Sequence, residues 1–248
     1  MVTTSARLRV PGADTHLEVV RHGSWGRPVL LFPSEAGSAH DAEGNGMLDA
    51  VRPLVDAGRV SLFCVDTLDA SSWCDNDLPT EERARRAQGY TSWLSEQVLP
   101  WVLEQTGGAH GVVTVGVSLG AYHAVHLTLR RADVAPVAIG LSGNYDVTTW
   151  NGWGEVGDAT YFANPAAYVA NMEGDHLAWI RSRVSVLLVV GQGAFEVSPT
   201  KALPATRAFS DVLSHKGIRH ELDVWGYDSA HDWPWWQRQL AHHLPRFV

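Results

Sequence analysis

The sequence predicts an α/β protein whose mainly parallel sheet is covered by helices on both faces. Short runs of apolar and β-branched residues alternate with amphipathic stretches through most of the chain, as strands and crossover helices do. The 248 residues show no change in composition that would mark a second domain, and 45% of them are hydrophobic. This is enough to form a substantial core. We therefore expect one domain over residues 1–248.

The chain is predicted to open with an antiparallel hairpin at the edge of the sheet. Residues 6–10 and 15–21 have strand character and are joined by Pro11-Gly12-Ala13-Asp14, residue types that favour a turn. The later strands are predicted from continuous apolar runs, because the strands of a parallel sheet are buried on both faces. These runs cover residues 29–32, 60–65, 112–115, 137–141, 184–190 and 221–225.

Helices are predicted between these strands. One extends from residue 81 to about residue 104 and begins with two acidic residues, which stabilise a first helical turn. Another begins at Pro199, a residue favoured in a first turn, and ends near His215. Residues 144–179 are rich in glycine, asparagine and aromatic side chains. They predict a cap-like excursion over the carboxyl edge of the sheet, where substrate-covering loops lie.

Composition limits the partners and the compartment that we expect. The formal net charge of −8 argues against nucleic acid and against an anionic membrane, because both select basic proteins. The charge fits a small neutral or cationic ligand better. We find neither a secretory leader nor an apolar run of about 18 residues, so we expect a cytoplasmic protein. Cys64 and Cys74 are expected to be free thiols. No residues have zinc-ligand spacing, so no metal or other cofactor is predicted. Homo-oligomerisation is compatible with the sequence.

The segment Gly116-Val117-Ser118-Leu119-Gly120 lies between a predicted buried strand and an amphipathic helix. A serine in a sharp strand-to-helix turn brings the backbone on its two sides close together, so the positions two before and two after it are small. The segment is therefore typical of the nucleophile elbow of α/β-hydrolases. Ser118 is the candidate nucleophile and the Leu119 N–H a candidate oxyanion donor. A purely structural turn is the alternative.

A serine nucleophile needs a general base and an acid that orients this base. His231 follows the last predicted strand and is the candidate base, the alternative being a capping or solvated loop residue. Glu196 follows the strand before it, which gives the order serine, acid, histidine of α/β-hydrolases. It could instead stabilise the start of the next helix. Asp223 and Asp228 are rival acids, disfavoured because they lie close to His231 in sequence.

The second oxyanion donor is expected from the loop after the first parallel strand. The N–H of Glu35 is the first candidate and the N–H of Ser34 the second. The chain has 11 tryptophans, a high number for its length. Trp73, Trp150 and Trp153 could line an acyl or aryl pocket, although packing in the core is the alternative for each.

Four segments resemble the putative esterase family, which includes esterase D, S-formylglutathione hydrolases, feruloyl esterases and mycolyltransferases. The segments are Leu31-Phe-Pro-Ser, Gly116-Val-Ser118-Leu-Gly-Ala-Tyr-His-Ala, Gly191-Gln-Gly-Ala-Phe-Glu196 and Trp225-Gly-Tyr-Asp-Ser-Ala-His231-Asp-Trp. The resemblance covers roughly residues 25–245. It implies a three-layer α/β-hydrolase fold and serine ester chemistry with Ser118, His231 and Glu196 as the triad. The sequence departs from the family at the acid, which is more often aspartate, and at the residues around His231, where Gly-Gly-His-Ser-Trp is common.

The sequence thus predicts a serine esterase that hydrolyses a carboxylic ester or thioester through an acyl-enzyme. An acyltransferase would use the same three residues. A catalytically silent hydrolase fold that acts as a binding or scaffold protein is an alternative of a different class, because a fold alone does not establish function.

Overall fold

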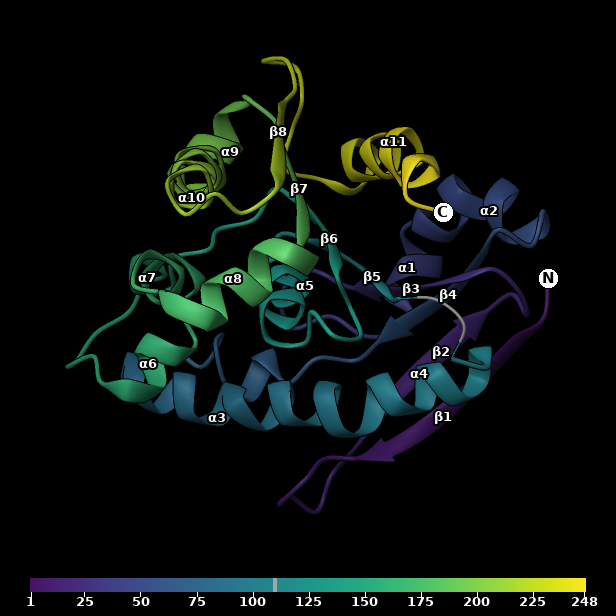
Figure 1. Cartoon of the computed structure of the whole chain (residues 1–248), viewed down its shortest axis with the longest axis horizontal. Helices are drawn as coiled ribbons and strands as arrows, with labels where there is room; N and C mark the ends of the chain where they lie inside the picture. Colours follow the sequence, from purple (N-terminus) through teal and green to yellow (C-terminus); the bar gives the residue numbers. More distant parts are fainter. Residues whose placement is uncertain (109–110) are drawn as a thin grey trace.

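An eight-stranded sheet forms the centre of the protein, and helices cover both of its faces (Figure 1). The computed structural model describes residues 1–108 and 111–248. The strand order is β1-β2-β4-β3-β5-β6-β7-β8. The pairs β1 with β2 and β2 with β4 are antiparallel, and all other pairs are parallel. The predicted mainly parallel sheet with an antiparallel hairpin at its start is therefore confirmed.

The strands follow the predicted apolar runs closely. They are β1 (Thr3–Arg9), β2 (His16–His22), β3 (Arg27–Phe32), β4 (Val60–Val65), β5 (Val113–Val117), β6 (Val137–Leu141), β7 (Ser185–Val190) and β8 (His220–Val224). β1 begins three residues before its predicted start. It is an exposed edge strand, so its first residues are polar and carry no apolar signal.

Eleven α-helices occur in the described residues. They are α1 (Asp41–Gly44), α2 (Met47–Asp56), α3 (Thr80–Trp93), α4 (Leu99–Thr106), α5 (Leu119–Arg130), α6 (Asp158–Phe162), α7 (Pro165–Ala170), α8 (Gly174–Arg183), α9 (Ala194–Val197), α10 (Ala202–His215) and α11 (Trp233–His243). The helix predicted over residues 81–104 consists of α3 and α4, joined by a π-helical turn at Leu94–Val98. α10 begins three residues after Pro199, because Lys201 has a left-handed backbone conformation that cannot continue a helix. None of the described helices has the length and apolar character needed to cross a membrane.

Alternate residues of each strand pack in opposite helical layers. Val29 and Leu31 contact the layer formed by α1, α2 and α11, whereas Leu30 and Phe32 contact the layer that contains α3, α4 and α5. α7, α8 and α10 complete the second layer over β6 and β7. Thus α7 and the first part of α8, which lie in the segment predicted to cap the sheet edge, cover a face of the sheet.

The turn between β5 and α5 depends on close backbone contact at two glycines. A Cβ atom added to Gly116 would lie 1.9 Å from the carbonyl oxygen of Gly120. A Cβ atom added to Gly120 would lie 2.0 Å from the carbonyl oxygen of Pro33, in the loop that follows β3. Neither glycine can carry a side chain without movement of the backbone. The turn is therefore packed against both the strand before it and the loop beside it.

We predict that Gly116→Ala destabilises the protein by about 3 kcal/mol or more, because a methyl group would overlap main-chain atoms that have no room to move. Chemical unfolding measures this loss. The matched control is Gly89→Ala in α3, where an added Cβ meets no atom within 4 Å. This control should gain about 0.5–1 kcal/mol, since alanine is the better helix former. Equal unfolding midpoints for Gly116→Ala and the wild type would contradict the packing described for the turn.

Candidate active site

Ser118 occupies the sharp turn between β5 and α5, at the carboxyl edge of the sheet. Its backbone has φ 55° and ψ −120°, a conformation that residues with a side chain rarely adopt. Strain of this kind is typical of functional positions. The helix that follows begins at Leu119, so the first N–H groups of this helix lie beside Ser118 and have no acceptor within the helix.

Three residues from separate connections form one hydrogen-bonded chain. His231 Nε2 lies 2.9 Å from Ser118 Oγ, and His231 Nδ1 lies 2.9 Å from Glu196 Oε2. Glu196 belongs to α9, after β7, and His231 belongs to the loop after β8. The side chains of His231 and Glu196 are 7% and 0% exposed, respectively. The structure thus brings together the three residues that the sequence predicts as nucleophile, base and acid.

The rival carboxylates lie elsewhere. Asp223 accepts hydrogen bonds from the side chains of Trp225 and His243, at 2.8 Å each. Asp228 is exposed. Neither carboxylate bonds to His231, so Glu196 is the acid within its reach among the described residues.

Ser142 holds the far oxygen of Glu196, a contact that the sequence analysis did not foresee. Its hydroxyl donates to Glu196 Oε1 at 2.5 Å, and the Trp236 indole N–H donates to Ser142 Oγ at 3.0 Å. The Trp236 ring also lies perpendicular to the His231 ring, with the ring centroids 5.0 Å apart. Ser142 directly follows β6 and has φ 55°. Its place after a buried strand beside β5 is the signal that could have identified it.

Two backbone N–H groups beside Ser118 are free to bind an oxyanion. Those of Leu119 and Glu35 have no acceptor among the described residues, and both residues line the cavity at Ser118. Ser34, the second predicted donor, lies outside the cavity lining, and its carbonyl accepts a hydrogen bond from Gly37. Glu35 N–H and Leu119 N–H are therefore the pair available for a developing negative charge.

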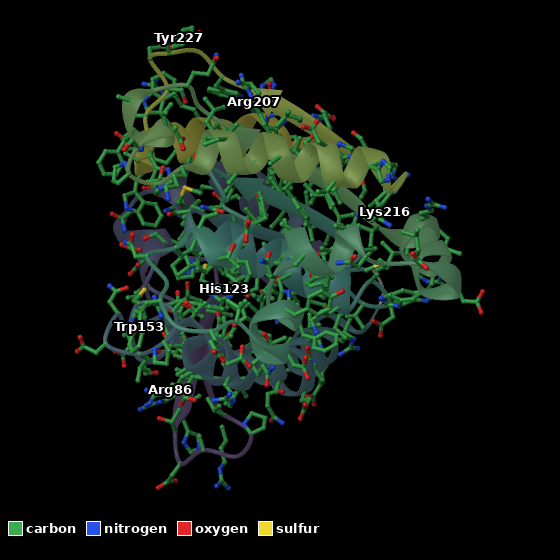
Figure 2. All side chains as sticks on the ribbon, turned by 90° about the vertical axis from the view of Figure 1, so that its left-hand side faces the viewer. Arg86, His123, Trp153, Arg207, Lys216 and Tyr227 are labelled. Atoms are coloured by element: carbon green, nitrogen blue, oxygen red, sulfur yellow. The ribbon has the colours of Figure 1, made fainter. Side chains whose placement is uncertain are left out.

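A buried histidine and aspartate pair supports the loop that carries Glu35. His123 Nε2 lies 2.8 Å from Asp69 Oδ1, and the two side chains are 4% and 1% exposed. The other oxygen of Asp69 accepts the N–H of Ala36 at 3.4 Å. His123 is in α5 and lies inside the molecule (Figure 2). The pair thus links the helix that follows Ser118 to the loop opposite.

A cavity of about 450 Å³ opens at Ser118 and His231. Trp73 and Trp150 form part of its wall and contact each other edge to face, with ring centroids 5.2 Å apart. Trp153, the third predicted pocket residue, is instead 53% exposed and donates its indole N–H to the Asn76 carbonyl at the molecular surface (Figure 2). The Gly-rich stretch around Trp153 carries its side chain outward, which residue type alone could not reveal.

Glu81 anchors the segment that contains Trp150 and α6. Its carboxylate accepts hydrogen bonds from the N–H groups of Gly157, Ala159 and Thr160 and from the Thr160 hydroxyl, at 2.7–3.0 Å. Burial raises the pKa of Glu81, but these four hydrogen bonds outweigh burial and lower it from 4.5 to about 2. A carboxyl group with a lowered pKa stabilises the fold above its unfolded pKa and loses this effect as the pH falls toward the folded value.

We predict that Glu81→Gln lowers the free energy of unfolding by about 2 kcal/mol at neutral pH, since the amide replaces a charged acceptor of four hydrogen bonds. The difference from the wild type should shrink as the pH falls from 4.5 toward 2. Urea unfolding at pH 7 and near pH 3.5 measures both effects. Glu82→Gln, which breaks only exposed pairs with Arg85 and Arg86, should cost less. A gap between wild type and Glu81→Gln that is the same at both pH values would contradict this role of Glu81.

Comparison with known proteins identifies the family and the fold. Residues 35–247 match the protein family described as "Putative esterase". No curated protein shows significant similarity to the chain.

Among solved structures, a ferulic acid esterase is 16% identical with a TM-score of 0.72, over 99% of this chain and 96% of the other. MPT51 (FbpC1) of Mycobacterium tuberculosis is 17% identical with a TM-score of 0.73, over 99% and 97%. An S-formylglutathione hydrolase from Agrobacterium tumefaciens is 12% identical with a TM-score of 0.73, over 98% and 93%. The likenesses show an α/β-hydrolase fold, and the family match shows that the chain belongs to the putative esterase family.

Proposed function

We propose that this protein hydrolyses a carboxylic ester or thioester of a small molecule, with Ser118 as nucleophile, His231 as general base and Glu196 as the acid that orients it. The observation that carries the proposal is the continuous hydrogen-bonded chain through these residues, with 2.9 Å at each link. They lie far apart in sequence. Their contact at the mouth of a cavity is what acyl transfer to serine requires.

In the proposed reaction, Ser118 Oγ attacks the ester carbonyl carbon while His231 Nε2 takes the hydroxyl proton. His231 keeps its Nδ1–H directed at Glu196, which stabilises the imidazolium that forms. The N–H groups of Leu119 and Glu35 bind the negative oxygen of the tetrahedral intermediate. The imidazolium then protonates the departing alcohol or thiol, and the acyl group remains on Ser118. Water, activated by the same histidine, releases the acid and restores the serine.

We predict that Ser118→Ala lowers kcat/KM for an activated acyl ester by about 10³-fold or more, because the acyl-enzyme can no longer form. Labelling by a fluorophosphonate should be lost as well, while the circular dichroism spectrum stays unchanged. Ser182→Ala, which alters an exposed serine in α8, is the matched control and should retain both properties. Full labelling of Ser118→Ala would exclude Ser118 as the nucleophile. Absence of any labelling in the wild type would favour a silent scaffold.

We predict that Ser142→Ala lowers kcat by about 10-fold to 100-fold with little change in KM, because Glu196 loses a charge-assisted hydrogen bond that holds it toward His231. Trp236→Phe is the companion variant. It keeps an aromatic ring against His231 but removes the N–H that orients Ser142, so its loss should be smaller. Wild-type kcat in Ser142→Ala, measured on the folded variant, would show that Glu196 needs no such support.

Transfer of the acyl group to an alcohol would use the same acyl-enzyme, and product analysis separates this reaction from hydrolysis. With an excess of a simple alcohol present, hydrolysis yields the free acid as the main product. A transferase yields the new ester, at a rate that depends on the alcohol concentration.

A further inference from the structure

Arg83 is a buried cation in the wall of the cavity at Ser118, and it forms no salt bridge within the described residues. Its side chain is 2% exposed. Nη1 donates to the Trp73 carbonyl at 3.1 Å and to Asn76 Oδ1 at 3.2 Å, and Nη2 donates to the Asn151 carbonyl at 2.9 Å. These neutral oxygens satisfy hydrogen bonds but do not neutralise the charge. A buried charge without a counter-ion is costly and is retained where a function needs it.

No carboxylate lies within salt-bridge distance of Arg83 among the described residues: Asp77, beside Asn76, is exposed and forms no ion pair, and the others have different partners. Glu81 binds the start of α6, and Asp69 binds His123. Two more are paired with exposed arginines of α3, namely Asp75 with Arg86, and Glu82 with both Arg85 and Arg86. The fold therefore offers Arg83 no counter-ion of its own in the part of the chain that the structure describes.

A second cation, Lys201, reaches the same short segment of the cavity wall. Its Nζ lies 3.4 Å from the Thr149 carbonyl, and Arg83 binds the Asn151 carbonyl. These two carbonyls belong to the residues on either side of Trp150, whose Cα atoms are at most about 7 Å apart. Lys201 holds a left-handed backbone conformation, with φ 56°, at the start of α10. The two cations thus contact the same three-residue segment of the cavity wall, and the positive potential that both contribute there favours a bound anion.

The other ionisable groups of the cavity do not cancel these charges. Glu35 is the one carboxylate in the described lining. It is exposed, as is Lys201, so it can offset one of the two positive charges and leaves the buried Arg83 uncompensated. Cys74 also lines the cavity, where burial raises its pKa to about 12. Its thiol is therefore neutral at physiological pH. The wall around Trp150 is positive in a protein whose formal net charge is −8.

We propose that Arg83 and Lys201 bind a carboxylate of the substrate beside Trp150, so that the preferred ester carries an anionic group in addition to the reacting carbonyl. Lys201 is exposed and contacts the carboxylate directly. The buried guanidinium of Arg83 attracts the carboxylate by its positive charge from inside the cavity wall. This inference rests on the proposed ester hydrolysis at Ser118 and names the class of substrate for that site.

The test compares pairs of similar esters, one of which carries a carboxylate and the other none, with release of the phenol as the measured reaction. Monophenyl adipate and phenyl hexanoate place the carboxylate on the acyl side, and 4-acetoxybenzoate and methyl 4-acetoxybenzoate place it on the alcohol side. We expect kcat/KM for the anionic member of at least one pair to exceed that of its neutral partner by about tenfold at low ionic strength. The pair that shows this preference identifies the side of the ester that faces Trp150. Added salt should reduce the preference.

Variants assign the preference to the two cations. Lys201→Gln should lower the anionic-to-neutral ratio of kcat/KM by about tenfold, and Lys201→Glu should lower it further. Arg207→Gln is the matched control. It removes one positive charge from the exposed side of α10, the helix that Lys201 precedes (Figure 2), and should leave the ratio unchanged. Arg83→Met should also lower the ratio. If this variant fails to fold, the two Lys201 variants still decide the question.

Two results would overturn the inference while leaving the proposed function intact. The first is hydrolysis of neutral esters as fast as, or faster than, the anionic ones in both pairs. The second is an anionic preference that survives both Lys201→Gln and Lys201→Glu. If instead neither ester of either pair is hydrolysed in a manner that depends on Ser118, both the proposed function and this inference fail.

Discussion

Direct backbone contact around the start of α5 is the constraint on which the rest of the site depends. Gly116 and Gly120 touch main-chain atoms across the turn, and Gly120 also touches Pro33 in the loop after β3. These contacts fix Ser118 in a strained conformation and set the Leu119 N–H beside the loop that carries Glu35. Because main-chain atoms form them, the positions of both N–H groups are independent of side-chain rotamers. A site that must stabilise a short-lived negative charge benefits from such rigidity.

The order of strands explains how the remaining groups meet. β6 lies between β5, which carries the serine, and β7, which precedes Glu196. The residue that follows β6, Ser142, therefore comes from the connection between those of the nucleophile and the acid, and its hydroxyl donates a hydrogen bond to Glu196. His231 enters from β8, on the far side of β7, and Trp236 of α11 contacts both His231 and Ser142. The parallel sheet brings these connections to one edge without any local sequence signal.

Much of this arrangement is predictable from the sequence, and the reasons are local. Buried parallel strands are continuous apolar runs, so β4 and β6 could be located to the residue. The elbow is encoded in five consecutive residues, because its geometry requires glycine at two fixed positions. Glu196 and His231 follow from the order of the strands that precede them. The strands and the elbow thus depend on neighbours in the chain, whereas the acid and the base depend on the order of the strands.

The features that could not be predicted depend on contacts between distant segments. The bonds of Ser142 to Glu196 and of His123 to Asp69 join residues 54 positions apart. Whether a tryptophan lines a cavity depends on the path of its loop, which is why Trp150 faces the cavity and Trp153 faces solvent. The isolation of Arg83 is visible only once the partners of every nearby carboxylate are known.

The cavity wall and the reacting groups are attached to different parts of the fold, so the substrate selectivity of this enzyme can change, by evolution or by mutagenesis, while its chemistry stays the same. The wall segment around Trp150 is held from outside the sheet by Glu81 and Arg83 of α3, whereas the reacting groups are held by the sheet edge and by glycine contacts. Residues at the wall can therefore be exchanged without disturbing the groups that move protons. A library of variants confined to residues 149–151 and 199–202 would explore new selectivities from a constant chemical centre, and a library that included the elbow would consist mainly of unfolded chains.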